Sequence, residues 1–199
     1  ARLGAHQPDR RLPLAQQRQD RRGQVQAATA AATGLACFIF RFLRRPLQAG
    51  FSPEGSALQL VLNTIVTAQQ SIRLMGYSFT SPEVTRALIQ AKQRGIDVKV
   101  VLDWKANSAK GSAGVAAMNL LANAGIPVRT VSQFKIMHDK VIITDGRNVE
   151  TGSFNYSRAA ANSNSENALV IRDYPALADT YLKHWQSRWE MGRDWSVSY

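Results

Sequence analysis

The sequence has few of the residues that build disulfides and metal sites. Cys37 is its only cysteine, so no disulfide can form within the chain. The three histidines, His6, His138 and His184, lie far apart, and none has a further histidine or cysteine at the spacing of metal ligands. We therefore expect no metal ion and no other cofactor.

No hydrophobic run is long enough for a membrane span. The longest, residues 27–40, is interrupted by two threonines and a glycine, so no stable membrane insertion is expected. An arginine-rich segment precedes this run, and residues 1–49 therefore resemble a degenerate secretory signal. The alternatives are a disordered tail or a misassigned start. We expect a periplasmic or secreted bacterial protein, with a cytoplasmic location as the alternative.

The positive charge is concentrated in that first segment. The net charge is +11, and residues 1–50 contribute nine arginines against two aspartates. Residues 51–199 hold sixteen lysines and arginines against twelve acidic residues. This mild excess fits a polyanionic substrate, but it is also what ordinary solubility requires.

Beyond the first segment, predicted helices and strands alternate, and we find no internal repeat. Ser52 and Pro53 resemble a helix N-cap and first helical position, and Ser81-Pro82 resembles a second helix start. The pattern predicts an α/β fold, a mixed β-sheet flanked by helices on both faces, over residues 50–199. The predicted helices are 53–69, 81–95, 112–124 and one from about 175, and the predicted strands are 71–77, 96–102, 128–131, 140–144, 148–152 and 168–171.

Two further segments invite a functional interpretation. Four aromatic or aliphatic residues recur every fourth position in the last helix, which favours a core stripe over a ligand platform: Leu177, Tyr181, Trp185 and Trp189. The loop 104–114 follows the end of a strand and contains two lysines and two glycines. It is interpreted either as a phosphate-contacting loop or as a solvated loop.

The strongest chemical signal is the pair His138 and Lys140 at the start of a β-type run. Residues two apart on a strand point to the same side, so an imidazole and an ammonium face one ligand. A phosphate ester suits both groups, because the imidazole can attack it while the ammonium holds its oxygens.

A hairpin brings further polar groups to this pair. Asp145-Gly146 is a strong turn signal between two β-rich runs. A turn of these two residues places His138 opposite Ser153, whereas a four-residue loop places it opposite Asn155. Either register gathers several polar functions at one point.

These residues resemble the phospholipase D superfamily, most closely its small bacterial endonucleases with one H-x-K-x4-D motif per chain. The likeness includes residues 138–145, the G-S-x-N motif at 152–155, Glu166 and the tryptophan-rich end. It extends from Phe51 to Tyr199 and leaves the first segment uncovered.

The resemblance implies a role for each residue. His138 would be the nucleophile that forms a phosphohistidine, and Glu166 would hydrogen-bond its other ring nitrogen. Lys140 and Asn155 would hold the phosphoryl oxygens, with the Ser153 hydroxyl near them. The remaining motif residues would be structural: Asp145 and Gly152.

The proposed chemistry also needs an acid for the leaving oxygen, and the chain has no second H-x-K motif. A homodimer with a shared active site would supply a second His138. The expected function is non-specific hydrolysis of nucleic-acid phosphodiester bonds, with DNA, or RNA, as substrate. The alternatives are a phospholipase D that hydrolyses phosphatidyl head groups and a non-catalytic nucleic-acid-binding module.

Overall fold

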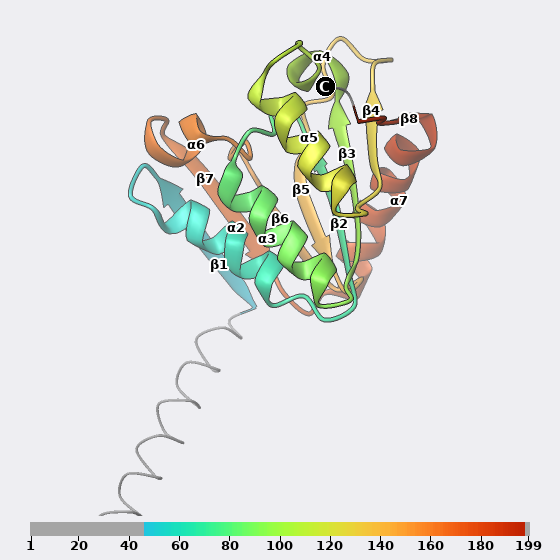
Figure 1. Cartoon of the computed structure of the whole chain (residues 1–199). Coiled ribbons are helices and arrows are strands. Elements are labelled where there is room, and N and C mark those ends of the chain that lie inside the picture. The colour runs from blue at the N-terminus through green and yellow to red at the C-terminus, as the bar shows by residue number, and fades with distance from the viewer. Residues whose placement is uncertain (1–45, 198–199) are drawn as a thin grey trace, which may run out of the picture. The chain divides into compact units, whose positions relative to one another are not determined.

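A computed structural model of the chain describes residues 46–197, which form one mixed sheet with helices on both faces (Figure 1). The predicted α/β class is confirmed. The strands are β1 (Leu47–Ser52), β2 (Ser71–Gly76), β3 (Asp97–Asp103), β4 (Val128–Val131), β5 (Lys140–Thr144), β6 (Asn148–Gly152), β7 (Glu166–Ile171) and β8 (Arg193–Asp194). The helices are α2 (Ser56–Val66), α3 (Pro82–Gln93), α4 (Trp104–Asn107), α5 (Ala113–Asn123), α6 (Arg158–Asn162) and α7 (Pro175–Met191).

The sheet has the strand order β1-β7-β6-β5-β2-β3-β4-β8 and consists of two halves. β2, β3 and β4 are parallel, whereas β5, β6, β7 and β1 form an antiparallel series. The halves meet where β5 pairs antiparallel with β2. As a result, the C-terminal ends of four strands lie on the side of the sheet where β5 begins: β2, β3, β4 and β6. This side runs across the strand ends and is called the edge of the sheet below.

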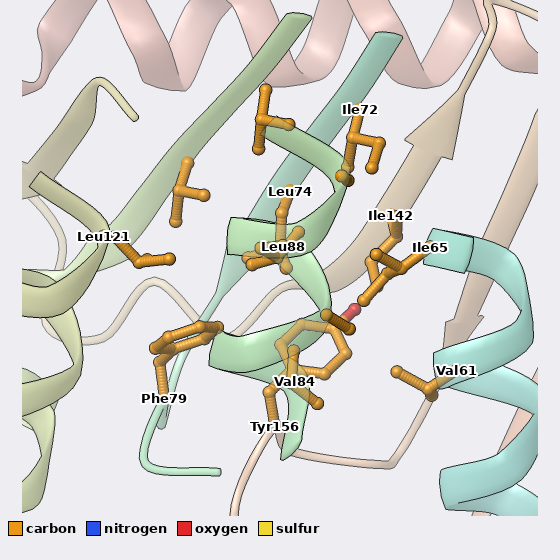
Figure 2. Packing of buried hydrophobic residues seen from close by; sticks show 14 of the residues in the cluster. Val61, Ile65, Ile72, Leu74, Phe79, Val84, Leu88, Leu121, Ile142 and Tyr156 are labelled. Carbon is orange, nitrogen blue, oxygen red and sulfur yellow. The ribbon is translucent and has the colours of Figure 1, made fainter. Parts of the chain in front are cut away.

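The larger hydrophobic core lies between the sheet and α2, α3 and α5 (Figure 2). Leu74 of β2 and Ile142 of β5 are fully buried there, against Val61, Ile65 and Leu88 of the helices. Alternate strand residues face this layer, as the two-residue period of a strand requires. The helix starts predicted at Ser81 and Ser112 are confirmed, since both hydroxyls accept a hydrogen bond from an N–H of the first turn.

The second core lies under α7, on the other face of the sheet. The predicted stripe of four residues belongs to it, with Trp185 buried and Leu177, Tyr181 and Trp189 packed against it. Trp185 also donates a hydrogen bond from Nε1 to the Leu74 carbonyl, 2.9 Å away. This stripe is therefore core, as predicted.

The first helix begins later than the sequence predicts. Ser52 is not an N-cap, because it pairs with Glu166 as the last residue of β1. The helix starts at Ser56, whose hydroxyl accepts a hydrogen bond from the Phe51 N–H at 2.8 Å. The sheet therefore takes residues that local capping signals assign to the helix. Residues 47–49, assigned to the first segment from sequence, also belong to β1.

The remaining predictions for the first segment concern residues 1–45, which lie outside the described part of the chain. Between residues 46 and 197, no helix is long and apolar enough to cross a bilayer.

The hairpin turn is formed by Asp145 and Gly146, which both have positive φ, 57° and 63°. The Arg147 N–H closes it by donating to the Thr144 carbonyl at 3.1 Å. Thr144 nevertheless pairs with Asn148, so Arg147 is an extra residue between the turn and β6. This bulge shifts the register by one residue, and neither predicted register is correct. Val141 pairs with Thr151, which sets Lys140 level with Gly152.

The strand β6 contains a buried acidic residue. Glu150 is fully buried, and the Tyr156 hydroxyl donates a hydrogen bond to its carboxyl group at 2.8 Å. Burial raises the pKa of Glu150 to about 8, against the weaker opposing effect of this hydrogen bond. The folded protein therefore holds a proton on Glu150 at neutral pH.

The raised pKa predicts that stability falls as the pH rises. The unfolded chain releases this proton near pH 4.5 and the folded chain near pH 8, so stability is lost progressively between these values. Glu150→Gln should remove this loss and be more stable than the wild type at pH 8, by a few kcal/mol in order of magnitude. Urea denaturation across this range measures the effect. The exposed Glu54→Gln is the control, and a wild-type slope in Glu150→Gln would contradict the prediction.

Candidate active site

His138 and Lys140 lie together at the edge where β5 begins. Lys140 pairs with Gly76, the last residue of β2, and the next residue along β2 is Tyr77. The exposed His138 ring lies against the Tyr77 ring with centroids 4.8 Å apart. The Lys140 ammonium lies 5.8 Å from the centre of the same ring. The two reactive groups therefore share one aromatic neighbour.

Lys140 is a buried cation, with 6% of its surface exposed. Its ammonium donates a hydrogen bond to the His138 carbonyl at 2.9 Å. Burial lowers the pKa of Lys140, while the nearby charges of Glu166 and Asp139 oppose this effect. A partly desolvated ammonium interacts more strongly with a phosphate than one fully in water.

Glu166 reaches this neighbourhood but does not have the predicted partner. Its carboxylate accepts hydrogen bonds from the Ser153 hydroxyl and from Asn164 Nδ2, the latter at 2.9 Å. Among residues 46–197, the His138 ring makes no hydrogen bond. The Ser153 N–H donates a hydrogen bond to the Asn167 carbonyl. This bond places the Ser153 hydroxyl beside the start of β7. Within one chain, Glu166 therefore acts on Lys140 through charge and not on the His138 ring.

Asn155 offers a polar group to a ligand. Its side chain is partly exposed, but its amide oxygen is buried and has no hydrogen-bond partner within the described part of the chain. Buried acceptors are rarely left unpaired in folded proteins. Phosphoryl oxygens are acceptors as well, so a contact between Asn155 and a phosphate has to be made by the amide N–H group and not by this oxygen.

The two residues assigned structural roles have contacts away from the reactive groups. Asp145 lies at the opposite end of β5, where its carboxylate accepts hydrogen bonds from the N–H groups of Gln69, Gln70 and Ser71. Gly152 passes so close to β7 that a Cβ would lie 2.3 Å from the Asn167 carbonyl oxygen. Any larger residue would displace the Ser153–Asn155 segment.

His184 approaches the motif, which the sequence analysis does not predict. Its Nε2 lies 3.1 Å from the carboxylate of Asp139, the residue between His138 and Lys140. The two residues are 45 positions apart and come from α7 and the segment before β5. No local pattern in the sequence signals this pair.

The first part of the loop 104–114 is ordered as α4 and holds the site in place. Asn107 is buried, donates to the Tyr77 carbonyl at 2.6 Å and accepts from the Phe79 N–H at 2.9 Å. At the end of β3, the Asp103 carboxylate accepts from the Met137 N–H at 2.7 Å. These bonds fix the segments that carry Tyr77 and His138.

Several known proteins are similar in sequence to this chain. A family described as "Cardiolipin synthase, PLD-like domain" matches residues 61–189. A "Phospholipase D" of Rickettsia bellii (strain RML369-C) is 37% identical over 150 residues, covering 75% of this chain and 72% of that protein. The "Mitochondrial cardiolipin hydrolase" of Homo sapiens is 35% identical over 139 residues, covering 69% of this chain and 53% of that protein.

Solved structures agree with this relationship. The crystal structure of Nuc from Salmonella typhimurium, described as a phospholipase D family member, is 56% identical with a TM-score of 0.73. The match covers 75% of this chain and 97% of that one. NucT from Helicobacter pylori, 23% identical with a TM-score of 0.63, shares the fold. This chain therefore belongs to the phospholipase D superfamily and is a phosphodiesterase of that superfamily.

The contacts of Asp145 predict a large loss of stability on its removal. Asp145→Ala leaves three backbone N–H groups without their acceptor, which should cost roughly 2–4 kcal/mol. Asp173 provides a matched control, because it also has positive φ but its carboxylate makes only an exposed ion pair with Arg147 among the described residues. Asp173→Ala should cost only about 1 kcal/mol. Chemical denaturation measures both variants, and equal losses would show that the hydrogen bonds of Asp145 contribute nothing.

Proposed function

We propose that this protein is a nuclease that hydrolyses the phosphodiester bonds of nucleic acids through a phosphohistidine on His138. The observation that carries the proposal is an exposed imidazole beside a buried ammonium, on an edge of the sheet that is positively charged. Three exposed cations lie on the segments that follow β3, β4 and β6 at this edge: Lys105, Lys135 and Arg158. A phosphate backbone is the polyanion that fits such an edge.

The reaction proceeds by two displacements at phosphorus. A ring nitrogen of His138 attacks, the bond to the leaving oxygen breaks, and an acid gives that oxygen a proton. Lys140 balances the negative charge on the non-bridging oxygens, and the Asn155 side chain helps to position them. Water then attacks the phosphohistidine, and the base that removes its proton is the former acid, so the enzyme is restored.

The acid comes from a second copy of the chain. The neighbouring outer strands β1 and β7 expose apolar side chains on one face of the sheet: Leu47, Phe51 and Leu169. Phe51 pairs with Asn167, the neighbour of Glu166. An uncovered apolar sheet face is a common dimer contact. A two-fold dimer with a shared site would bring both His138 rings to one phosphate.

The second candidate is hydrolysis of phospholipid head groups. The names of the Rickettsia and human relatives favour it, because one is called a phospholipase D and the other a cardiolipin hydrolase. The chemistry at phosphorus would be the same, and only the group recognised around the phosphate would differ.

Cleavage of nucleic acid is the direct test of the substrate. The purified protein should cut double-stranded and single-stranded DNA, and it should do so in excess EDTA because Lys140 supplies the positive charge at phosphorus. Plasmid nicking and choline release from phosphatidylcholine are measured side by side. Choline release without cleavage of any nucleic acid would reverse the assignment, and loss of nicking in EDTA that magnesium restores would contradict the role of Lys140.

Mixing experiments test the shared site. His138→Asn should abolish turnover, and heterodimers with wild-type chains should be nearly inactive because each shared site lacks one imidazole. Under subunit exchange, activity should fall as the square of the wild-type fraction. Chains with Lys183→Ala, an exposed change on α7, serve as the control diluent and should not lower activity. A linear fall with the His138→Asn fraction, or full activity from a monomer in sedimentation, would contradict the dimer.

A further inference from the structure

The elements α4, α5, β4 and β8 lie near one another at one end of the sheet (Figure 1). Residues from these elements line a cavity of about 970 Å³. His138, Lys140 and Asn155 do not line it. It is bounded by two tryptophans, Trp104 and Trp195, by the loop that contains Lys110, and by Arg193. The mechanism described above leaves these residues without a role.

The two tryptophans form an aromatic wall with one fixed and one accessible ring. Their ring centroids are 6.3 Å apart, and the planes are inclined by 52°. Trp195 donates a hydrogen bond from Nε1 to Asn119 Oδ1 at 2.9 Å, which sets the orientation of its ring. Trp104 is 43% exposed although it is a large apolar residue. An exposed indole beside an anchored one offers a flat ligand a surface for stacking.

The charge at the cavity is positive. Lys110 and Arg193 are exposed, and neither forms an ion pair with any residue between 46 and 197. The only acidic residue that lines the cavity, Asp194, already pairs with Arg129 at 2.7 Å. A ligand with both a planar ring and negative charge matches this combination of groups.

A hydrogen bond joins the segment that carries Trp104 to the segment that carries His138. Trp104 directly follows Asp103, whose carboxylate holds the N–H of Met137, the residue before His138. β4, which lines the cavity with Thr130, lies three strands from β5 in the sheet, a separation of about 14 Å at the usual interstrand spacing. A nucleic-acid strand with one phosphate at His138 can therefore extend across these strands and place a nearby nucleotide in the cavity.

We propose that this cavity binds a nucleotide near the scissile phosphate of a single-stranded nucleic acid. Its base stacks on the exposed Trp104 ring with Trp195 at its side, and Lys110 and Arg193 contact its phosphates. Stacking on aromatic side chains accepts any base, so the site would add affinity without sequence preference. This inference rests on the nuclease function proposed above.

Binding to the inactive full-length His138→Asn protein isolates this site from catalysis. The affinity for a fluorescent oligothymidylate of about ten nucleotides is measured by anisotropy. In this background, Trp104→Ala should raise the Kd about tenfold, Trp104→Phe should restore most of the affinity, and Lys110→Ala should raise the Kd severalfold. Tyr174→Ala and Lys183→Ala remove an exposed aromatic ring and an exposed charge outside the cavity, and should leave the Kd unchanged.

Kinetics with His138 intact separate this inference from the nuclease assignment. Trp104→Ala and Lys110→Ala should slow cleavage of the oligonucleotide and leave hydrolysis of bis(p-nitrophenyl) phosphate unchanged, because that small diester cannot reach the cavity. Unchanged oligonucleotide binding and cleavage in both variants would overturn the cavity site and leave the nuclease intact. A wild-type protein that hydrolyses the small diester and phosphatidylcholine vesicles, but no nucleic acid, would overturn both. Lys110 is exposed on a loop, so its variant tests the inference even if Trp104→Ala fails to fold.

Discussion

The antiparallel pairing of β5 with β2 determines where the chemistry of this protein lies. It joins the parallel and antiparallel halves of the sheet and places Lys140 beside Gly76, at the point where β2 ends. A side chain at Gly76 would meet Leu102 at 3.1 Å and the Tyr156 ring at 3.3 Å. The absence of a side chain at Gly76 therefore leaves room for the Leu102 and Tyr156 side chains. The next residue, Tyr77, lies against the His138 ring. The hydrogen bonds of Asp103 and Asn107 hold the segments on either side.

Burial of the Lys140 ammonium strengthens its interaction with a bound negative charge, but it also costs solvation free energy. Moving an ammonium out of water is unfavourable unless other charges compensate, and a single carbonyl bond compensates Lys140 only in part. Glu166 and Asp139 supply nearby negative charge, yet neither forms an ion pair with the Lys140 ammonium in the described part of the chain. A bound phosphate diester would complete the compensation. On this view the incompletely paired cation is the reason that the site favours the charge that builds up during phosphoryl transfer.

Local patterns predict the parts of this protein that depend on local geometry. The strand start at Lys140, the helix starts near Ser81 and Ser112 and the core stripe of α7 all follow from short-range periodicity and capping, and the structure confirms them. The α/β class follows from the alternation of these elements. The same logic finds the turn at Asp145-Gly146.

The features that sequence reasoning misses depend on contacts between distant segments. β1 is an edge strand that exists because it pairs with β7, so the local capping signal at Ser52 is misleading. The bulge at Arg147 shifts the hairpin register by one residue, which no turn signal specifies. Ser153 bonds to Glu166 because the ends of β6 and β7 adjoin, and the Asp139–His184 pair requires α7 to pack on that face. The aromatic wall of the cavity likewise joins residues 91 positions apart.

Isolation of the covalent intermediate would examine the role of His138 without reference to the natural substrate. The enzyme is mixed with a diester radiolabelled at phosphorus, quenched in alkali during turnover and digested for peptide mapping. We predict a labelled, acid-labile phosphohistidine at His138 that is absent from the His138→Asn protein. Label on any other residue, or turnover by the His138→Asn protein at the wild-type rate, would contradict the assignment of His138 as the nucleophile.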